Sequence, residues 1–186
     1  MGLEPKELIA VEELVKEKRR DLVSRGFAKP YAQAMAVTQL REERARSGKV
    51  VVKASDREWW ADRMGARAKY ILDHSYEDTA TDEWRVFIHD IRTQSGSHRH
   101  QGGLALFALE GHGATIMNGK KYEWEKGDLI LLPVLPGEVE HRHINYGGDA
   151  KWIAFIYTPA WHATATTITQ VSDRKDWKGE PGMAIE

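Results

Sequence analysis

Two stretches of the sequence decide the fold: SHRHQGGLALFALEGHG over residues 97–113 and GDLILLPVLPGEVEHRHIN over residues 127–145. Each carries a His-x-His triplet. In a β-strand, residues i and i+2 point to the same side, so His98 and His100 share one face, as do His141 and His143. The triplets start 43 residues apart, which leaves room for several antiparallel hairpins. Strands separated in this way can converge inside a barrel. Since imidazole binds Fe, Zn, Cu, Ni and Mn, the pattern predicts a metal site.

The sequence around these stretches is typical of short β-strands from Val50 onward. Asn118-Gly119 is a two-residue hairpin signal, and Lys126-Gly127-Asp128 indicates another turn. Short, evenly spaced strands predict an all-β sandwich or barrel. The expected strands cover residues 67–72, 84–92, 104–109, 114–117, 122–124, 129–132, 144–146, 152–157 and 166–171. We therefore divide the chain into a helical N-terminal arm (1–48), a β-barrel (49–172) and a C-terminal tail (173–186) rich in Lys, Asp, Gly and Pro.

The N-terminal arm has the apolar spacing of two helices. From Leu8 through Val11 to Leu22, apolar residues recur at helical spacing; Gly26 can end the first helix and Pro30 can open the second. A DNA-binding helix-turn-helix is the alternative, but 10 Lys and Arg face 8 Asp and Glu here without forming a basic face. We prefer an arm that covers a sheet or joins two subunits. The expected assembly is a homodimer or a higher homo-oligomer.

The composition excludes several classes of site and of partner. The 186 residues include no cysteine, so disulfides, thiolate metal sites and cysteine nucleophiles are excluded, and a metal must be held by nitrogen and oxygen. A net charge of −1 gives no field that would attract nucleic acid or anionic lipid. The N-terminus lacks the apolar run of a signal peptide, and no apolar stretch approaches the ~20 residues that span a bilayer. We expect a cytoplasmic protein that binds neither nucleic acid nor membrane.

The two stretches resemble the two motifs of the cupin family. His98-Arg99-His100 with Glu110-Gly111-His112-Gly113 resembles the first motif. The run from Gly127 to Pro133, followed by His141 and Asn145, resembles the second. The His-Arg-His triplet, the run FALEG over residues 107–111 and the His-x-His-x-Asn pattern are similar to the gentisate- and salicylate-type ring-cleaving dioxygenases. The resemblance implies a cupin barrel (double-stranded β-helix, or jelly roll) with an α-helical N-terminal arm.

The resemblance implies that His98, His100 and His141 are the metal ligands. Many cupins add a glutamate four or five residues after the second histidine, where this chain has Leu104 and Ala105. A three-histidine site is thus implied, with Fe(II) as the first choice of metal and Mn, Ni or Zn as alternatives. His143 would lie on the same strand face as His141. It would either act as a general acid or base toward the substrate or bound oxygen, or pack as a polar residue beside the site.

The sequence departs from the gentisate-type pattern where a substrate carboxylate would bind. Gentisate-type enzymes share an arginine eight residues after the first ligand, which binds the substrate carboxylate. In this chain that position is Leu106. Leu106 therefore predicts a pocket that favours a neutral or phenolic ring, or an enolised diketone, over a carboxylated substrate; the alternative is that another cation such as Arg85 binds the carboxylate. Trp84 and Gln101 are further candidates for substrate contact. The loop 133–140 is longer than usual and would reshape the pocket.

These patterns favour an Fe(II)-dependent dioxygenase that cleaves a C–C bond of a hydroxylated aromatic or enolisable small molecule with O2. The same three histidines would also serve a non-redox cupin lyase, isomerase or hydrolase that uses Zn, Ni or Mn as a Lewis acid. A small-molecule-binding cupin without turnover is the third alternative. O2 consumption during turnover separates the first of these functions from the other two.

Overall fold

The computed structural model describes residues 6–61, 63–65, 67–164, 167–179 and 184–185, with the backbone alone for residues 6–12 and 184–185. The expectations for the first five residues, for the side chains of Leu8 and Val11, for Thr166 and for part of the C-terminal tail lie outside the described residues. The chain forms two compact units. One comprises residues 1–53 and 72–83, and the other comprises residues 54–71 and 84–186.

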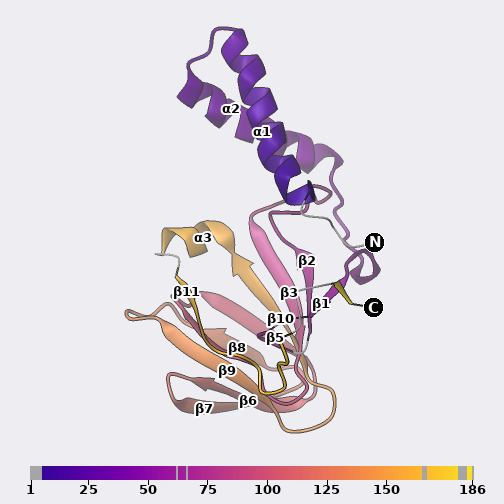
Figure 1. The fold of residues 1–186 in the computed structure, drawn as a ribbon, viewed down its shortest axis with the longest axis vertical. Coiled ribbons are helices and arrows are strands. Elements are labelled where there is room, and N and C mark those ends of the chain that lie inside the picture. Colours follow the sequence, from indigo (N-terminus) through magenta and orange to yellow (C-terminus); the bar gives the residue numbers. More distant parts are fainter. Residues whose placement is uncertain (1–5, 62, 66, 165–166, 180–183, 186) are drawn as a thin grey trace. The chain divides into compact units, whose positions relative to one another are not determined.

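The first unit is built on two helices, α1 (Lys6–Ser24) and α2 (Lys29–Ser47) (Figure 1). The helices pack through Leu22, Ala32 and Ala36, which are all buried. Alanine at two contact positions lets the two backbones approach closely. Gly26 turns the chain between the helices with a φ of +94°, a conformation that glycine adopts without strain. The prediction of N-terminal helices is confirmed, and no helix in the described part of the chain is both long enough and apolar enough to cross a membrane.

The segment after β2 (Arg67–Leu72) belongs to the helical unit because it is bound to the end of α2. The amide of Lys49 donates to the carbonyl of Asp78 at 2.8 Å, and the amide of Ala80 donates back to the carbonyl of Lys49 at 3.0 Å. An ion pair of 3.1 Å joins Arg44 to Asp82. These contacts tie residues 72–83 to the C-terminal end of α2.

The second unit consists of two antiparallel sheets that enclose the core (Figure 1). The larger sheet has the order β12-β1-β2-β3-β10-β5-β8, and the smaller one has the order β11-β4-β9-β6-β7. Apart from β2, the elements of this unit are η1 (Ala54–Asp56), β1 (Trp59–Ala61), β3 (Trp84–Asp90), β4 (Ser97–His100), β5 (Leu104–Glu110), β6 (His112–Met117), β7 (Lys120–Glu125), β8 (Leu129–Leu132), β9 (Val139–Asn145), β10 (Lys151–Tyr157), α3 (Thr158–Ala163), β11 (Ile168–Ser172) and β12 (Ala184–Ile185).

Strand alternation decides which side chains form the core. Along β5, Leu104, Leu106 and Ala108 are buried, and along β10 the buried positions are Trp152, Ala154 and Ile156. Residues of the same parity pair across the two strands, as Ala154 does with Leu106, so their side chains share one layer. The prediction of an all-β barrel with N-terminal helices is confirmed.

Two details of the barrel show what the sequence pattern can and cannot indicate. The Asn118-Gly119 hairpin joins β6 to β7 as predicted, with φ values of +48° and +80° at its two residues. In contrast, β9 begins at Val139, five residues before the strand expected at 144–146. Its inward positions include His141 and His143, and polar side chains hide the alternation of buried and exposed residues on which the expectation rested.

Asn145 ends this strand, and its side chain binds two backbone segments, residues 91–92 and 147–148. Its side-chain amide nitrogen lies 2.8–3.0 Å from the carbonyl oxygens of Ile91, Arg92 and Gly148, and its amide oxygen accepts from the amide of Gly147 at 2.8 Å. An Asn145→Ala change would leave these backbone groups without their partner at a mostly buried position. We expect it to lower the free energy of unfolding by about 2–4 kcal/mol, measured by urea denaturation. The exposed Thr169→Ala control is expected to stay within about 0.5 kcal/mol of the unmodified chain.

Candidate metal centre

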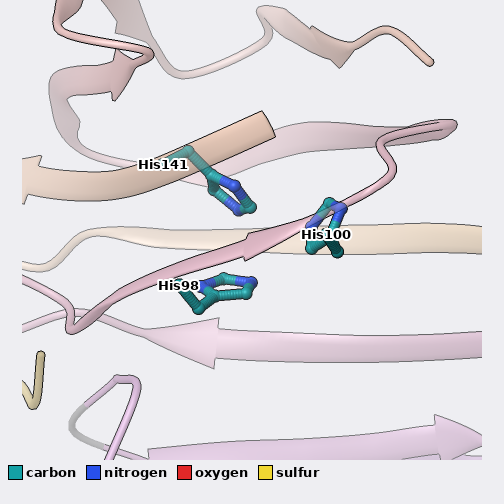
Figure 2. Close-up of side chains that lie close together, drawn as sticks. All are labelled: His98, His100 and His141. Carbon is teal, nitrogen blue, oxygen red and sulfur yellow. The ribbon is translucent and has the colours of Figure 1, made fainter. Parts of the chain in front are cut away.

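Three histidines on two adjacent strands point into one space. β4 carries His98 and His100, β9 carries His141, and the two strands pair so that His98 lies directly opposite His141. Ring centroids are 4.2 Å apart for His98 and His141, 4.8 Å for His100 and His141, and 5.2 Å for His98 and His100. Figure 2 shows the three side chains facing one another, and one ring nitrogen from each lies within 4.8 Å of the other two. As the sequence predicted, the strands that carry the two His-x-His triplets meet inside the barrel.

All three rings are uncharged at neutral pH, because burial disfavours the cation. Burial lowers the pKa of His100 to about 4. For His98 and His141 burial again comes first, and repulsion between the neighbouring histidines lowers the pKa further. A neutral imidazole offers a lone pair to a metal, whereas an imidazolium offers none.

The hydrogen bonds of the three rings are consistent with a metal site. The Nδ1 atoms of His98 and His141 are buried and have no hydrogen-bond partner among the described residues. Nδ1 of His100 accepts from the amide of Gly102 at 3.0 Å, which fixes that ring and leaves Nε2 available. Three neutral rings with uncommitted nitrogens suit a divalent ion such as Fe, Mn, Ni or Zn. No carboxylate joins them among the described residues.

Gly102 has a backbone conformation that the turn after His100 requires. Its φ is +85°, and a Cβ atom at this position would lie 1.9 Å from the carbonyl oxygen of Pro133. Any other residue would clash with backbone as well as being strained. The Gly102 amide that orients His100 therefore depends on the absence of a side chain.

A cavity of about 200 Å³ opens beside the three rings. Its wall is mostly aliphatic and aromatic, and among the described residues that line it there is one guanidinium and no carboxylate. Besides the three histidines, the lining comprises Met64, Tyr70, Arg85, Phe87, His89, Leu104, Leu106, Trp152, Ile156, Trp161, Ile168 and Gln170. Such a cavity can hold a small, flat organic molecule next to the ion.

Two of the predicted substrate-contacting residues line this cavity. Arg85 lies on β3 with Phe87 and His89, and the alternation of the strand brings all three to the cavity wall. Leu106 lies on β5 and is only 1% exposed. The strand between them, β10, pairs with both β3 and β5. The two positions considered for binding a carboxylate are thus part of the same pocket.

Trp84 and Gln101 are not among the residues that line the cavity. Trp84 lies opposite Tyr157 of β10 and packs against it, with ring centroids 5.1 Å apart. Gln101 is buried but faces backbone: its amide nitrogen donates to the carbonyl of Trp161 at 3.0 Å, and its amide oxygen accepts from Thr167. Gln101 therefore holds α3, and with it the Trp161 wall, in place. The loop 133–140 likewise contributes no residue to the lining.

His143 lies deeper in the barrel than the three histidines of the cluster. It is 2% exposed, its Nδ1 lies 2.9 Å from the hydroxyl of Thr115, and its ring packs against Trp152 and His141. Burial lowers its pKa well below the ordinary value, so the ring is neutral. It is absent from the cavity lining, whereas His89 of β3, which is also buried, is part of it.

Sequence reasoning missed several residues of the cavity wall, including Met64, Tyr70, Trp161 and Gln170. Gln170 arrives through the pairing of β11 with β4, which sets it opposite His98. Trp161 arrives through α3, where its ring lies 4.9 Å from that of His100. Both residues follow the second motif in the sequence by more than 15 residues. The only sequence signal for Trp161 was the high number of tryptophans, which does not distinguish a core residue from a pocket residue.

The structure is a two-sheet β-barrel of cupin type, and its three clustered histidines could hold a metal ion. Residues 87–157 match the model of the Cupin_2 family, described as a cupin domain. This segment of the barrel is similar to a cupin domain, and its motifs resemble those of the gentisate- and salicylate-type ring-cleaving dioxygenases, as the sequence implied. Dioxygenases are among its distant relatives.

Individual relatives are distant and are matched over limited lengths. A 5-aminosalicylate 1,2-dioxygenase of Comamonas sp is 32% identical over 63 residues, which is 34% of this chain and 16% of that protein. The salicylate 1,2-dioxygenase of Pseudaminobacter salicylatoxidans is 22% identical with a TM-score of 0.44, over 55% of this chain and 29% of that one. The polyketide cyclase RemF of Streptomyces resistomycificus is 13% identical with a TM-score of 0.49, over 71% and 88% of the two chains.

Proposed function

We propose that this chain is a non-haem Fe(II)-dependent dioxygenase that cleaves a C–C bond of a hydroxylated aromatic or enolisable small molecule with O2. The observation that carries the proposal is a cluster of three neutral histidines beside a small and mostly apolar cavity, with no carboxylate joining the cluster in the part of the chain that the structure describes. Three neutral ligands leave the full charge of a divalent ion uncompensated and part of its coordination shell open. The relationship to a 5-aminosalicylate 1,2-dioxygenase supports the same chemistry.

In this proposal His98, His100 and His141 hold the ion, and the ion supplies the redox chemistry that joins O2 to an electron-rich substrate. The protein positions the substrate and excludes water. The aromatic rings of Phe87, Trp152 and Trp161 give the cavity flat apolar walls against which a planar ring can lie. The low polarity of this wall strengthens the electrostatic interactions that remain inside it.

We assign the binding of an anionic substrate group to Arg85. The sequence favours a substrate without a carboxylate, with Arg85 as the alternative partner for one. Because Arg85 lies on the cavity wall, the alternative is now the better explanation. A carboxylate buried without a cationic partner is costly, and a guanidinium can bind it with two parallel hydrogen bonds. The favoured substrate is therefore a hydroxylated aromatic acid.

We assign a positioning role to His143. Its Nδ1 lies beside the Thr115 hydroxyl, and its ring packs edge-on against His141 at 5.4 Å between centroids. It can therefore hold the ligand ring at the correct angle from behind. A direct proton transfer to the substrate would require contact with the cavity, which the described geometry of His143 lacks.

Anaerobic metal analysis followed by an O2-electrode assay tests the proposed function. The purified chain, loaded with Fe(II), is offered phenols, hydroxyaromatic acids and diketones. We expect one equivalent of O2 to be consumed per substrate opened, with the highest activity on a hydroxyaromatic acid. Turnover without O2 consumption would instead establish a lyase, isomerase or hydrolase, and saturable binding without turnover would establish a binding protein.

A further inference from the structure

The outer side of the larger sheet carries an unusually continuous set of apolar side chains. On four neighbouring strands, β3, β10, β5 and β8, the outward positions form two complete rows across the sheet and a partial third row. The rows are Val86–Phe155–Ala105–Leu131, Ile88–Ile153–Phe107–Leu129 and Trp84–Tyr157. We call these ten residues the outer apolar face.

The large side chains of this face are exposed to solvent. Leu129 and Leu131 are 59% and 61% exposed, and Trp84, Phe107, Phe155 and Tyr157 are 39–45% exposed. With roughly 200 Å² for a fully exposed side chain of this size, these six contribute about 600 Å². The largest apolar patch of a typical monomer is about 300–600 Å², and a stable dimer buries about 800 Å² on each partner. The exposed area of only six of the ten residues therefore reaches the upper limit for a patch on a monomer.

Charged residues border the outer apolar face but do not interrupt it. The next row of the sheet consists of Asp90, Lys151 and Glu110, so both signs of charge lie at one end of the face. Lys151 is ion-paired to Glu110, and Asp90 to Arg67. An apolar centre with a balanced charged border is the anatomy of a protein–protein interface. A surface that binds anionic lipid would instead carry an excess of Lys and Arg.

We propose that the outer apolar face is the interface of a symmetric dimer, in which a second copy of this chain packs its own β3-β10-β5-β8 face against it. An apolar surface of this size needs a partner present whenever the chain is folded, and the chain itself meets that condition at equal concentration. A two-fold axis pairs the face with itself, and a surface of uncharged side chains is complementary to its own copy. The two sheets pack face to face at about 10 Å, as the layers of a β-sandwich do. The interface therefore lies on the barrel and not on the helical arm.

Sedimentation equilibrium of the full chain and of two variants tests this interface. We expect the unmodified chain to have twice the mass of the 21.2 kDa protomer. The double variant with Phe107→Glu and Leu131→Glu is expected to associate on the order of 100-fold more weakly, since it places four charges in the interface. Val171→Glu is the matched control: Val171 is 43% exposed on β11 of the other sheet, and this variant should remain dimeric. Circular dichroism verifies that each variant is folded.

A second measurement uses the absence of cysteine from the chain. Phe107→Cys and Phe155→Cys, prepared separately, each give a protomer with one thiol, and a short bis-maleimide should link two protomers in at least one of them. Val171→Cys should remain unlinked. The proposal is overturned by a monomeric unmodified chain at micromolar concentration, which would leave the face to the helical arm or to another protein. It is equally overturned by a double variant that stays as dimeric as the unmodified chain, or by a dimer in which neither face thiol is linked.

Discussion

The His141→Ala variant is expected to lose its divalent metal, with an affinity lowered on the order of 100-fold or more and with activity lost in parallel. His141 joins β9 to the two histidines of β4, so its removal leaves two imidazoles from one strand on one side of the ion. Two neutral ligands in a partly apolar cavity form a weak and misshapen site. His98→Ala and His100→Ala should have the same effect. Metal content after anaerobic dialysis, measured by mass spectrometry, gives the result directly and needs no substrate.

Two other histidine variants serve as comparisons for this experiment. His112→Ala removes an exposed ring that lies outside the cluster and should retain both metal and activity. His143→Ala should retain most of the metal while lowering kcat, and it should alter the absorption spectrum of the Co(II)-loaded protein because the ring that packs behind His141 is gone. A purely structural role would lower stability without altering that spectrum. Metal loss in His143→Ala together with metal retention in His141→Ala would reverse our assignment within the pair.

The placement of the three histidines could be predicted from one local rule, strand alternation, together with the resemblance to cupins. Strand alternation brings i and i+2 to one face, and His98 and His100 obey it over a single four-residue strand. The pairing of His98 with His141 then depended on β9 being the neighbour of β4, which the resemblance to cupins implied and spacing alone did not. The glycine and Asn-Gly turns were also recognisable from local sequence, because positive φ values restrict the residues that can occupy them.

The cavity wall could not be predicted because it depends on contacts between segments far apart in the sequence. Trp161 and Gln170 reach the wall through α3 and β11, and nothing in their immediate sequence marks them as pocket residues. His143 obeys the same alternation as His141, yet one further step of two residues along β9 moves it from the cavity wall into the core. Periodicity predicts the face on which a side chain lies, but the depth along that face is decided by the packing of the opposite sheet.

Arg85→Leu is expected to change the substrate preference more than any other variant that leaves the metal in place. Arg85 is the guanidinium on a cavity wall that contains no carboxylate among its described residues, and Leu106, where the related pattern has an arginine, offers neither charge nor donor. Removing Arg85 should lower kcat/KM for a hydroxyaromatic acid on the order of 100-fold, about 2.7 kcal/mol, as expected for the loss of a charge-assisted hydrogen-bonded pair. The matched phenol without the carboxylate should change by less than about threefold, so the ratio between the two substrates measures the role of the charge.

A second arginine position within the pocket makes this test sharper. In the Arg85→Leu background, Leu106→Arg restores a guanidinium from β5, two strands away across β10, and should recover part of the preference for the acid. Arg99→Leu is the control, because Arg99 is exposed, paired to Glu140 at 3.1 Å and absent from the cavity lining. If Arg85→Leu lowers the rates for the acid and the phenol equally, then Arg85 acts on the shape of the pocket and not on substrate charge. If the unmodified chain prefers the phenol by tenfold or more, the substrate is neutral, and Leu106 by itself explains the departure from the gentisate-type pattern.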